Sequence, residues 1–182
     1  MAVILAKWTI HEYHSMIETG LLDNRQVELL KGEIVEMPPE GEAHAYFSSE
    51  AEDYLRSLLG DRATIRSGKP ITLPDDSEPE PDIAVVQKLG REYLTHHPYA
   101  ENILWLIEYS NSSLDKDLNI KTRIYAEAGI KEYWIVNIQK RQLMIFREPQ
   151  EIEYAAKFTL SEGVIYPLAF PALAVEVKRI IS

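Results

Sequence analysis

The sequence predicts an α/β fold around a mixed β-sheet, and two observations carry this prediction. Residues 103–107 and 133–136 are continuous apolar runs, which are typical of strands buried on both faces of a sheet. Residues 115–128, between these runs, have the periodicity of a helix and are followed by Gly129. A buried strand, a helix and a second buried strand within ~35 residues indicate a βαβ unit with a right-handed crossover.

The remaining elements follow from caps, turn residues and periodicity. Thr9 is expected to cap a helix that runs through Glu18, and residues 42–59 show a helical apolar stripe that ends before Gly60. Short stretches bounded by turn residues are expected as strands: residues 26–30, 33–37, 63–66, 70–73, 82–86 and 142–146. The first two flank Lys31-Gly32 and predict a hairpin, and the tail from Ile152 is expected to add one or two edge strands.

Length and composition bound the class of protein. The chain has 182 residues, of which 46% are hydrophobic and 26% charged, so a single globular domain over residues 1–182 is expected. It has no cysteine, which excludes a disulfide scaffold, an iron–sulfur site and a cysteine nucleophile. No apolar run approaches the ~18 residues of a membrane span, so a cytoplasmic protein without membrane partners is expected.

Glu108 directly follows the apolar run at residues 103–107. The carboxyl end of a buried strand is where open α/β sheets place their ligands, which makes this carboxylate a candidate site residue. The alternative is that the strand reaches the surface there and that Glu108 is simply solvated.

Lys121 lies on a helical stripe that is otherwise apolar: Leu114, Leu118, Tyr125 and Ala128. The opposite side of the predicted helix is polar and consists of Lys116, Asn119, Arg123 and Glu127. A lysine on the apolar side must extend its amine to the surface, find an anion or lower its pKa. The alternative is an ordinary ion pair with Asp117, four residues earlier.

Asp82 stands at the start of a predicted strand, directly after Pro81, which cannot donate a ladder hydrogen bond. In that strand Asp82 shares one face with Ala84 and Val86. A solvated acidic loop is the alternative, and it accounts for the preceding acidic residues: Asp75, Asp76, Glu78 and Glu80.

Two carboxylates on neighbouring strands and a lysine on an adjacent helix together predict a Mg²⁺ (or Mn²⁺) site that hydrolyses phosphodiester bonds. Carboxylate oxygens suit a hard cation, which polarises a phosphoryl oxygen and activates water. The amine of Lys121 could position that water or offset negative charge in the transition state. No competing catalytic motif is present, because the sequence has no phosphate-binding glycine loop and its five histidines lack a zinc-site spacing.

Short motifs in a fixed order extend this prediction over nearly the whole chain. They are ELLKGEI at residues 28–34, His44, EPDIAVV at 80–86, EYS at 108–110, the series Asp117, Lys121 and Tyr125, and AGIKEYWIV at 128–136. With these motifs the chain resembles the Uma-two family of endonucleases, in the PD-(D/E)XK superfamily with the restriction-endonuclease-like fold.

This resemblance implies a mixed β-sheet flanked by helices, a DNA substrate and a possible homodimer. It implies a metal site formed by Asp82 and Glu108, with Glu28 near the metal and the backbone carbonyl of Tyr109 as a candidate further ligand. The sequence departs from the superfamily at Ser110, where lysine is usual, and the resemblance implies that Lys121 supplies the amine from the helix. A second departure is Asn137, where relatives often carry aspartate.

The charge of the chain leaves other functions open. The formal net charge is −10, which opposes binding to DNA, whereas residues 116–147 carry seven basic and three acidic side chains and could face phosphates. The alternatives to a DNA endonuclease are a non-catalytic protein-interaction or regulatory module on the same scaffold, or a metal-dependent hydrolase of a smaller phosphorylated substrate.

Overall fold

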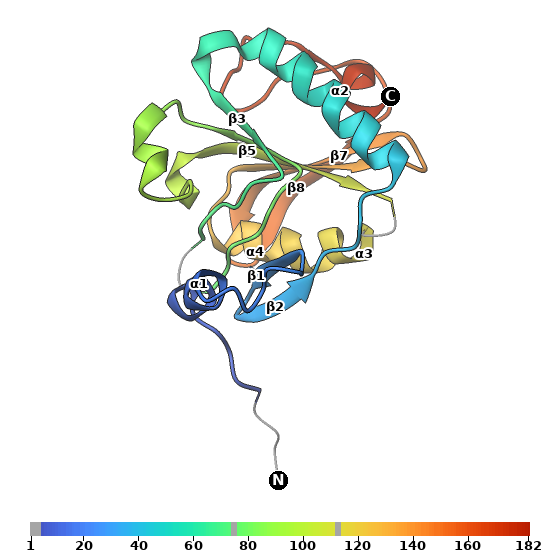
Figure 1. The fold of residues 1–182 in the computed structure, drawn as a ribbon. Coiled ribbons are helices and arrows are strands. Elements are labelled where there is room, and N and C mark those ends of the chain that lie inside the picture. Colours follow the sequence, from blue (N-terminus) through green and yellow to red (C-terminus); the bar gives the residue numbers. More distant parts are fainter. Residues whose placement is uncertain (1–4, 74–75, 112–113) are drawn as a thin grey trace.

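The computed structural model of the protein describes residues 5–73, 76–111 and 114–182 (Figure 1). Asp75 of the acidic stretch lies outside the described residues. The strands are β1 (Val27–Leu30), β2 (Glu33–Glu36), β3 (Thr64–Ser67), β4 (Ile83–Val86), β5 (Ile103–Ser110), β6 (Glu132–Asn137), β7 (Gln142–Gln150), β8 (Glu153–Leu160), β9 (Val164–Ile165) and β10 (Val175–Glu176). The helices are α1 (Ile10–Glu18), α2 (Glu42–Leu59), α3 (Leu114–Lys116), α4 (Thr122–Glu127) and α5 (Val177–Ile181), with a π-helical turn η4 (Asp117–Lys121) and 3-10 turns η1 (Gly60–Arg62), η2 (Gly90–Leu94) and η3 (Ala100–Asn102).

Strands β3 to β8 form one mixed sheet in sequence order. β5 and β6 are parallel, and the other neighbouring pairs of this sheet are antiparallel. The segment α3–η4–α4 connects the two parallel strands, which confirms the predicted strand–helix–strand unit. β1 pairs with β2, and β9 pairs with β10, in two separate two-stranded sheets.

Helices cover both faces of the large sheet (Figure 1). On one face, Trp105 and Ile107 of β5 share a core cluster with Leu55 of α2. On the other face, Leu106 of β5 shares a second cluster with Tyr125 of α4. The predicted α/β fold, a mixed sheet flanked by helices, is therefore confirmed. Within the described ranges, no helix has the combined length and apolarity that a membrane span requires.

Most predicted elements are present with small changes at their ends. The first helix begins after Thr9, whose side chain accepts a hydrogen bond from the amide of Glu12 in a capping box. The predicted hairpin forms around Lys31-Gly32, and Lys31 and Gly32 both have positive φ angles. The helix at residues 42–59 has the predicted bounds.

The predicted strand at residues 70–73 is wrong, because Thr72 and Leu73 form only isolated bridges. Their amide groups donate to the carbonyl oxygens of Pro98 and Ser77, which belong to different segments of the chain. No continuous ladder with one partner strand can form from such contacts.

The C-terminal tail contains more structure than the one or two edge strands predicted. β8 is the expected edge strand of the large sheet, but the tail also contributes β9, β10 and helix α5. Helix α5 buries Val177, Ile180 and Ile181, yet its five residues are too few to show a helical period in the sequence.

The register of β4 and β5 brings the two candidate carboxylates together. Ile83 lies opposite Ile107 in this antiparallel pair, so the next position places Asp82 opposite Glu108. Side chains alternate between the two faces of a sheet, and Ala84 and Leu106 lie in the cluster under α4. Asp82 and Glu108 therefore belong to the face that α3, η4 and α4 cover.

Truncating the core under α2 should destabilise the whole fold. Leu55 is fully buried, so we expect Leu55→Ala to lower the free energy of unfolding by about 2–5 kcal/mol. Leu94 is 74% exposed, so Leu94→Ala is the matched control and should change the free energy of unfolding by less than about 0.5 kcal/mol. Urea unfolding followed by circular dichroism measures both values, and equal losses in the two variants would contradict this packing.

Candidate active site

A pocket of about 450 Å³ opens beside the carboxyl end of β5. Asp82, Glu108 and Lys121 all line it, so the structure brings together the three residues that the sequence predicts as a catalytic set. The walls also include Lys116 and Asp117, from the connection between the parallel strands. These groups come from three separate segments, which meet because β4 and β5 pair and the connection crosses over them.

Asp82 is held through one of its two carboxylate oxygens. Oδ2 accepts a hydrogen bond from the backbone N–H of Tyr109 at 2.5 Å, and Nε2 of His44 lies 3.0 Å from the same oxygen. A carboxylate only accepts hydrogen bonds, so Nε2 of His44 is the donor in this contact. Among the described residues no hydrogen bond reaches Oδ1 of Asp82, which leaves this oxygen for a ligand.

Glu108 is almost fully buried, and its two oxygens have different surroundings. Oε1 accepts hydrogen bonds from Nζ of Lys121 and from the hydroxyl of Tyr125, both at 2.9 Å. From the described residues, Oε2 receives only a long contact, 3.4 Å, from the amide of Asp82. Burial raises the pKa of Glu108 above its usual value; the charge of Lys121 opposes this shift, and the charges of Asp82 and Asp117 add to it.

Lys121 is 3% exposed and lies between two carboxylates. Its Nζ is 2.9 Å from Oε1 of Glu108 and 3.2 Å from Oε2 of Glu28. Burial favours the neutral amine, but the charges of Glu108, Glu28 and Asp117 outweigh it and raise the pKa of Lys121 above its usual value. Lys121 therefore neither reaches the surface nor has a lowered pKa, because its amine pairs with anions in the interior.

Glu28, on the first hairpin, is fully buried and faces two lysines. Its Oε1 is 3.0 Å from Nζ of Lys116, and its Oε2 accepts a hydrogen bond from the amide of Glu80 as well as contacting Lys121. Burial alone would raise the pKa of Glu28, but the two lysines together hold it below its usual value. Both oxygens of Glu28 are thus used by protein groups, and its predicted role as a metal ligand stays a prediction.

The helical connection differs from the regular helix that the sequence predicts. Residues Asp117–Lys121 form a π-helical turn, so the stripe before this turn is rotated relative to the stripe after it. Lys116, predicted on the polar outer side, instead lines the pocket and binds Glu28. Asp117 accepts a hydrogen bond at 2.5 Å from the hydroxyl of Ser110, where the superfamily usually has its lysine.

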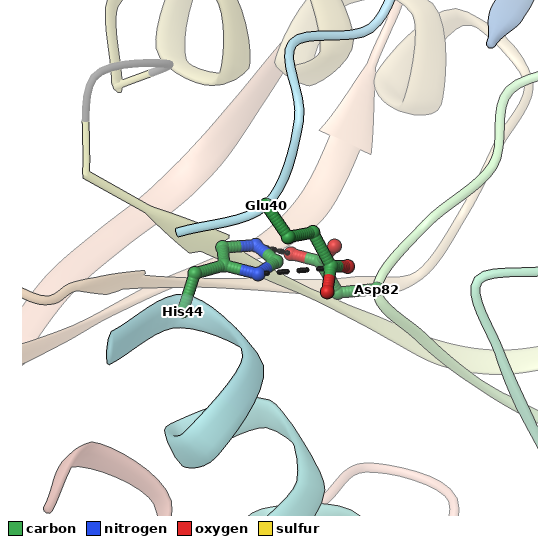
Figure 2. Close-up of side chains that lie close together, drawn as sticks. All are labelled: Glu40, His44 and Asp82. Atoms are coloured by element: carbon green, nitrogen blue, oxygen red, sulfur yellow. Dashed lines mark hydrogen bonds and ion pairs between the residues drawn. The ribbon is translucent and has the colours of Figure 1, made fainter. Parts of the chain in front are cut away.

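His44 lines the pocket, although the sequence predicts no catalytic role for it. It lies in the first turn of α2, and the carboxylates of Asp82 and Glu40 both lie on one side of its ring (Figure 2). Burial lowers the pKa of His44, but the hydrogen bond and charge of Asp82 raise it overall. Histidine spacing could not reveal this contact, since Asp82 is 38 residues away in the sequence. The signal that did include His44 was its place among the family motifs.

The mixed sheet and its flanking helices have the restriction-endonuclease-like fold. A crystal structure from Anabaena variabilis, described as "a putative nuclease belonging to DUF820", is similar in fold, with a TM-score of 0.66 at 16% identity over 85% of this chain and 89% of that one. The model of the Uma2 family, described as "Putative restriction endonuclease", matches residues 10–178. The chain therefore belongs to the Uma2 family, as the resemblance implied. No curated protein sequence matches it.

Removing the amine of Lys121 should destabilise the protein, because it leaves buried carboxylates without their cation. We expect Lys121→Met to lower the free energy of unfolding by up to about 3–5 kcal/mol. Lys116→Met is the matched control: among the described carboxylates its Nζ contacts only Glu28, and the side chain is 22% exposed, so the loss should be smaller. Urea unfolding of the two variants measures the difference, and an equal or larger loss in Lys116→Met would contradict the assignment.

Proposed function

We propose that the protein is a metal-dependent endonuclease that hydrolyses phosphodiester bonds in DNA. In this proposal Asp82 and Glu108 bind a divalent cation, Mg²⁺ or Mn²⁺, and Lys121 is the catalytic amine. The observation that carries the proposal is the contact of 2.9 Å between Lys121 and Glu108 in a pocket that Asp82 also lines. Membership of the Uma2 family supports it independently.

The donor atoms of the pocket fit a hard cation. Oδ1 of Asp82 is not hydrogen-bonded by any described residue, and Oε2 of Glu108 has only the long contact with an amide. The two carboxylates are cross-strand neighbours on one face, and Mg²⁺ in proteins is typically held by one or two such groups and several waters. A cation bound there would polarise a phosphoryl oxygen and lower the pKa of a bound water.

The chain's own residues supply fixed positions and charge. The amide of Tyr109 and the ring of His44 fix Asp82, and Tyr125 and Lys121 fix Oε1 of Glu108. Glu28 holds the amine of Lys121 from the other side, and the pKa of this lysine keeps it charged. A fixed ammonium at the pocket wall can orient a water molecule and offset the negative charge of a phosphate in the transition state. A role of the Tyr109 carbonyl as a ligand stays part of the proposal.

Basic side chains at the rim support a nucleic acid substrate in spite of the net charge of −10. Lys140 and Arg141 occupy the turn between β6 and β7, and both are exposed. This turn lies beside the pocket, because Nε2 of Gln139 donates a hydrogen bond to Oδ1 of Asn111, which lines the pocket. A phosphate backbone that enters the pocket would therefore pass two cations.

Cleavage of DNA tests the proposed function. Supercoiled plasmid incubated with the protein and Mg²⁺ or Mn²⁺ should be nicked or linearised, and EDTA should abolish the reaction. Glu108→Gln and Lys121→Met should lower the rate by about 10²-fold or more, since each removes a charged group from the site. Lys157→Met, in edge strand β8, is the control and should retain the wild-type rate.

Metal binding separates the proposal from its alternatives. Calorimetric titration with Mn²⁺, in the absence of DNA, should show that the wild-type protein binds the metal and that Asp82→Asn weakens this binding. Equal cleavage rates in wild type and Lys121→Met would contradict the catalytic assignment. Metal-dependent hydrolysis of bis(p-nitrophenyl) phosphate without cleavage of DNA would instead favour a smaller phosphorylated substrate, and absence of Mn²⁺ binding would favour a non-catalytic module.

The basic turn should contribute to the salt dependence of DNA binding. If Lys140 and Arg141 each contact one phosphate, Lys140→Gln and Arg141→Gln should each reduce the slope of log K against log [salt] by about 0.9. Fluorescence anisotropy with a labelled duplex, in Ca²⁺ to prevent cleavage, measures this slope between 50 and ~200 mM salt. Lys157→Gln serves as the control, and a slope that none of the variants changes would remove the turn from the interface.

A further inference from the structure

We propose that Glu40, His44 and Asp82 form a second cation position, distinct from the one between Asp82 and Glu108, which takes a transition-metal ion such as Zn²⁺. One oxygen from each carboxylate and one imidazole nitrogen would be its protein ligands. This position shares Asp82 with the proposed nuclease site but requires neither Glu108 nor Lys121.

The three side chains converge in the structure. Their candidate ligand atoms, one from each residue, all lie within 4.8 Å of one another. Nε2 of His44 is 3.0 Å from Oδ2 of Asp82, and Nδ1 is 3.6 Å from Oε1 of Glu40. A single ion would bind one ring nitrogen, and Nδ1 is the available one because Nε2 donates its proton to Asp82. Adjacent ligands at a right angle on an ion with bonds of about 2.1 Å are roughly 3 Å apart, so the 3.6 Å between Nδ1 and Oε1 of Glu40 closes to ligation after a small side-chain movement. Figure 2 shows the ring with both carboxylates on the same side of it.

The imidazole is poorly satisfied by protein groups alone. Nδ1 of His44 is buried and, within the described chain, has no hydrogen-bond partner, because the oxygen of Glu40 stays beyond hydrogen-bond distance. A buried ring nitrogen without a partner is costly, and a bound cation would tie Glu40 to the ring. The Glu40 side chain is 60% exposed, so it can move toward the ring without disturbing the core.

The donor set distinguishes this position from the first one. The first position offers carboxylate oxygens, which suit Mg²⁺, whereas an imidazole nitrogen favours Zn²⁺ and other later transition metals. The two positions share Asp82: its Oδ2 contacts His44 and the amide of Tyr109, and no described residue donates a hydrogen bond to its Oδ1. The pocket gives access from solvent, because Glu40 and His44 line it together with Asp82.

The chain contains a matched control for this proposal. Glu92 and His96 form a second Glu–His pair with the same spacing of four residues, a separation of 3.7 Å and nearly the same exposure as Glu40 and His44. No third carboxylate joins that pair in the cation clusters of the described residues. Any affinity for Zn²⁺ that comes from a Glu–His pair alone would therefore be shared by both pairs.

Calorimetric titration with Zn²⁺ at pH 8, in the presence of excess Mg²⁺, tests the proposal. The wild-type protein should bind one Zn²⁺ that Mg²⁺ does not displace. His44→Gln and Glu40→Gln should each weaken the affinity for Zn²⁺ by at least about 10–100-fold. That is the loss typical of removing a residue that only hydrogen-bonds a metal ligand. His96→Gln and Glu92→Gln should leave the affinity unchanged, and thermal unfolding in EDTA should show that all four variants remain folded.

Glu108→Gln separates this proposal from the proposed function. It should abolish Mg²⁺-dependent cleavage and leave the binding of Zn²⁺ within about twofold of wild type. Loss of Zn²⁺ binding in Glu108→Gln would mean one shared position and would overturn the inference. The inference would also be overturned if His44→Gln bound Zn²⁺ as tightly as wild type does, or if wild type bound no Zn²⁺. Either result would leave His44 only as a hydrogen-bond donor to Asp82.

Discussion

Lys121 is almost fully buried, and two carboxylates, Glu108 and Glu28, keep its amine charged. The geometry of the rest of the pocket depends on these two ion pairs. An ammonium without partners in such surroundings would lose its proton or force the helical connection away from the sheet. The two acids come from β5 and from the first hairpin, so one side chain joins the central sheet, the crossover and a peripheral element. Stability and site geometry are therefore set by the same contacts.

Much of this could be predicted from the sequence because it depends on local periodicity. The strand start at Asp82 and the apolar run before Glu108 marked both carboxylates as candidate site residues, and the helical stripe singled out Lys121 as a lysine on an apolar face. These inferences need only the geometry of a strand or helix and the position of a residue within it.

The rest depends on contacts that no local pattern encodes. The π-helical turn rotates the residues before it relative to those after it, and the spacing of apolar residues does not reveal this rotation. The sequence therefore predicted Lys116 on the outer, polar side of the helix, whereas it faces the pocket. His44 meets Asp82 only because α2 packs across the sheet, and Glu28 meets its lysines only because the hairpin folds back over the crossover. The isolated bridges at Thr72 and Leu73 likewise arise from partners far away in the chain.

The hairpin that supplies Glu28 is a separate two-stranded sheet, and Leu29 joins it to the segment before β4 through a bridge with Glu78. Small peripheral units of this kind can detach from a protein at a lower free-energy cost than global unfolding. Such a local opening would take Glu28 away from Lys121 while the large sheet stayed intact. Under the proposed function such an opening would inactivate the site transiently, and amide hydrogen exchange would register it in the hairpin before the core exchanges.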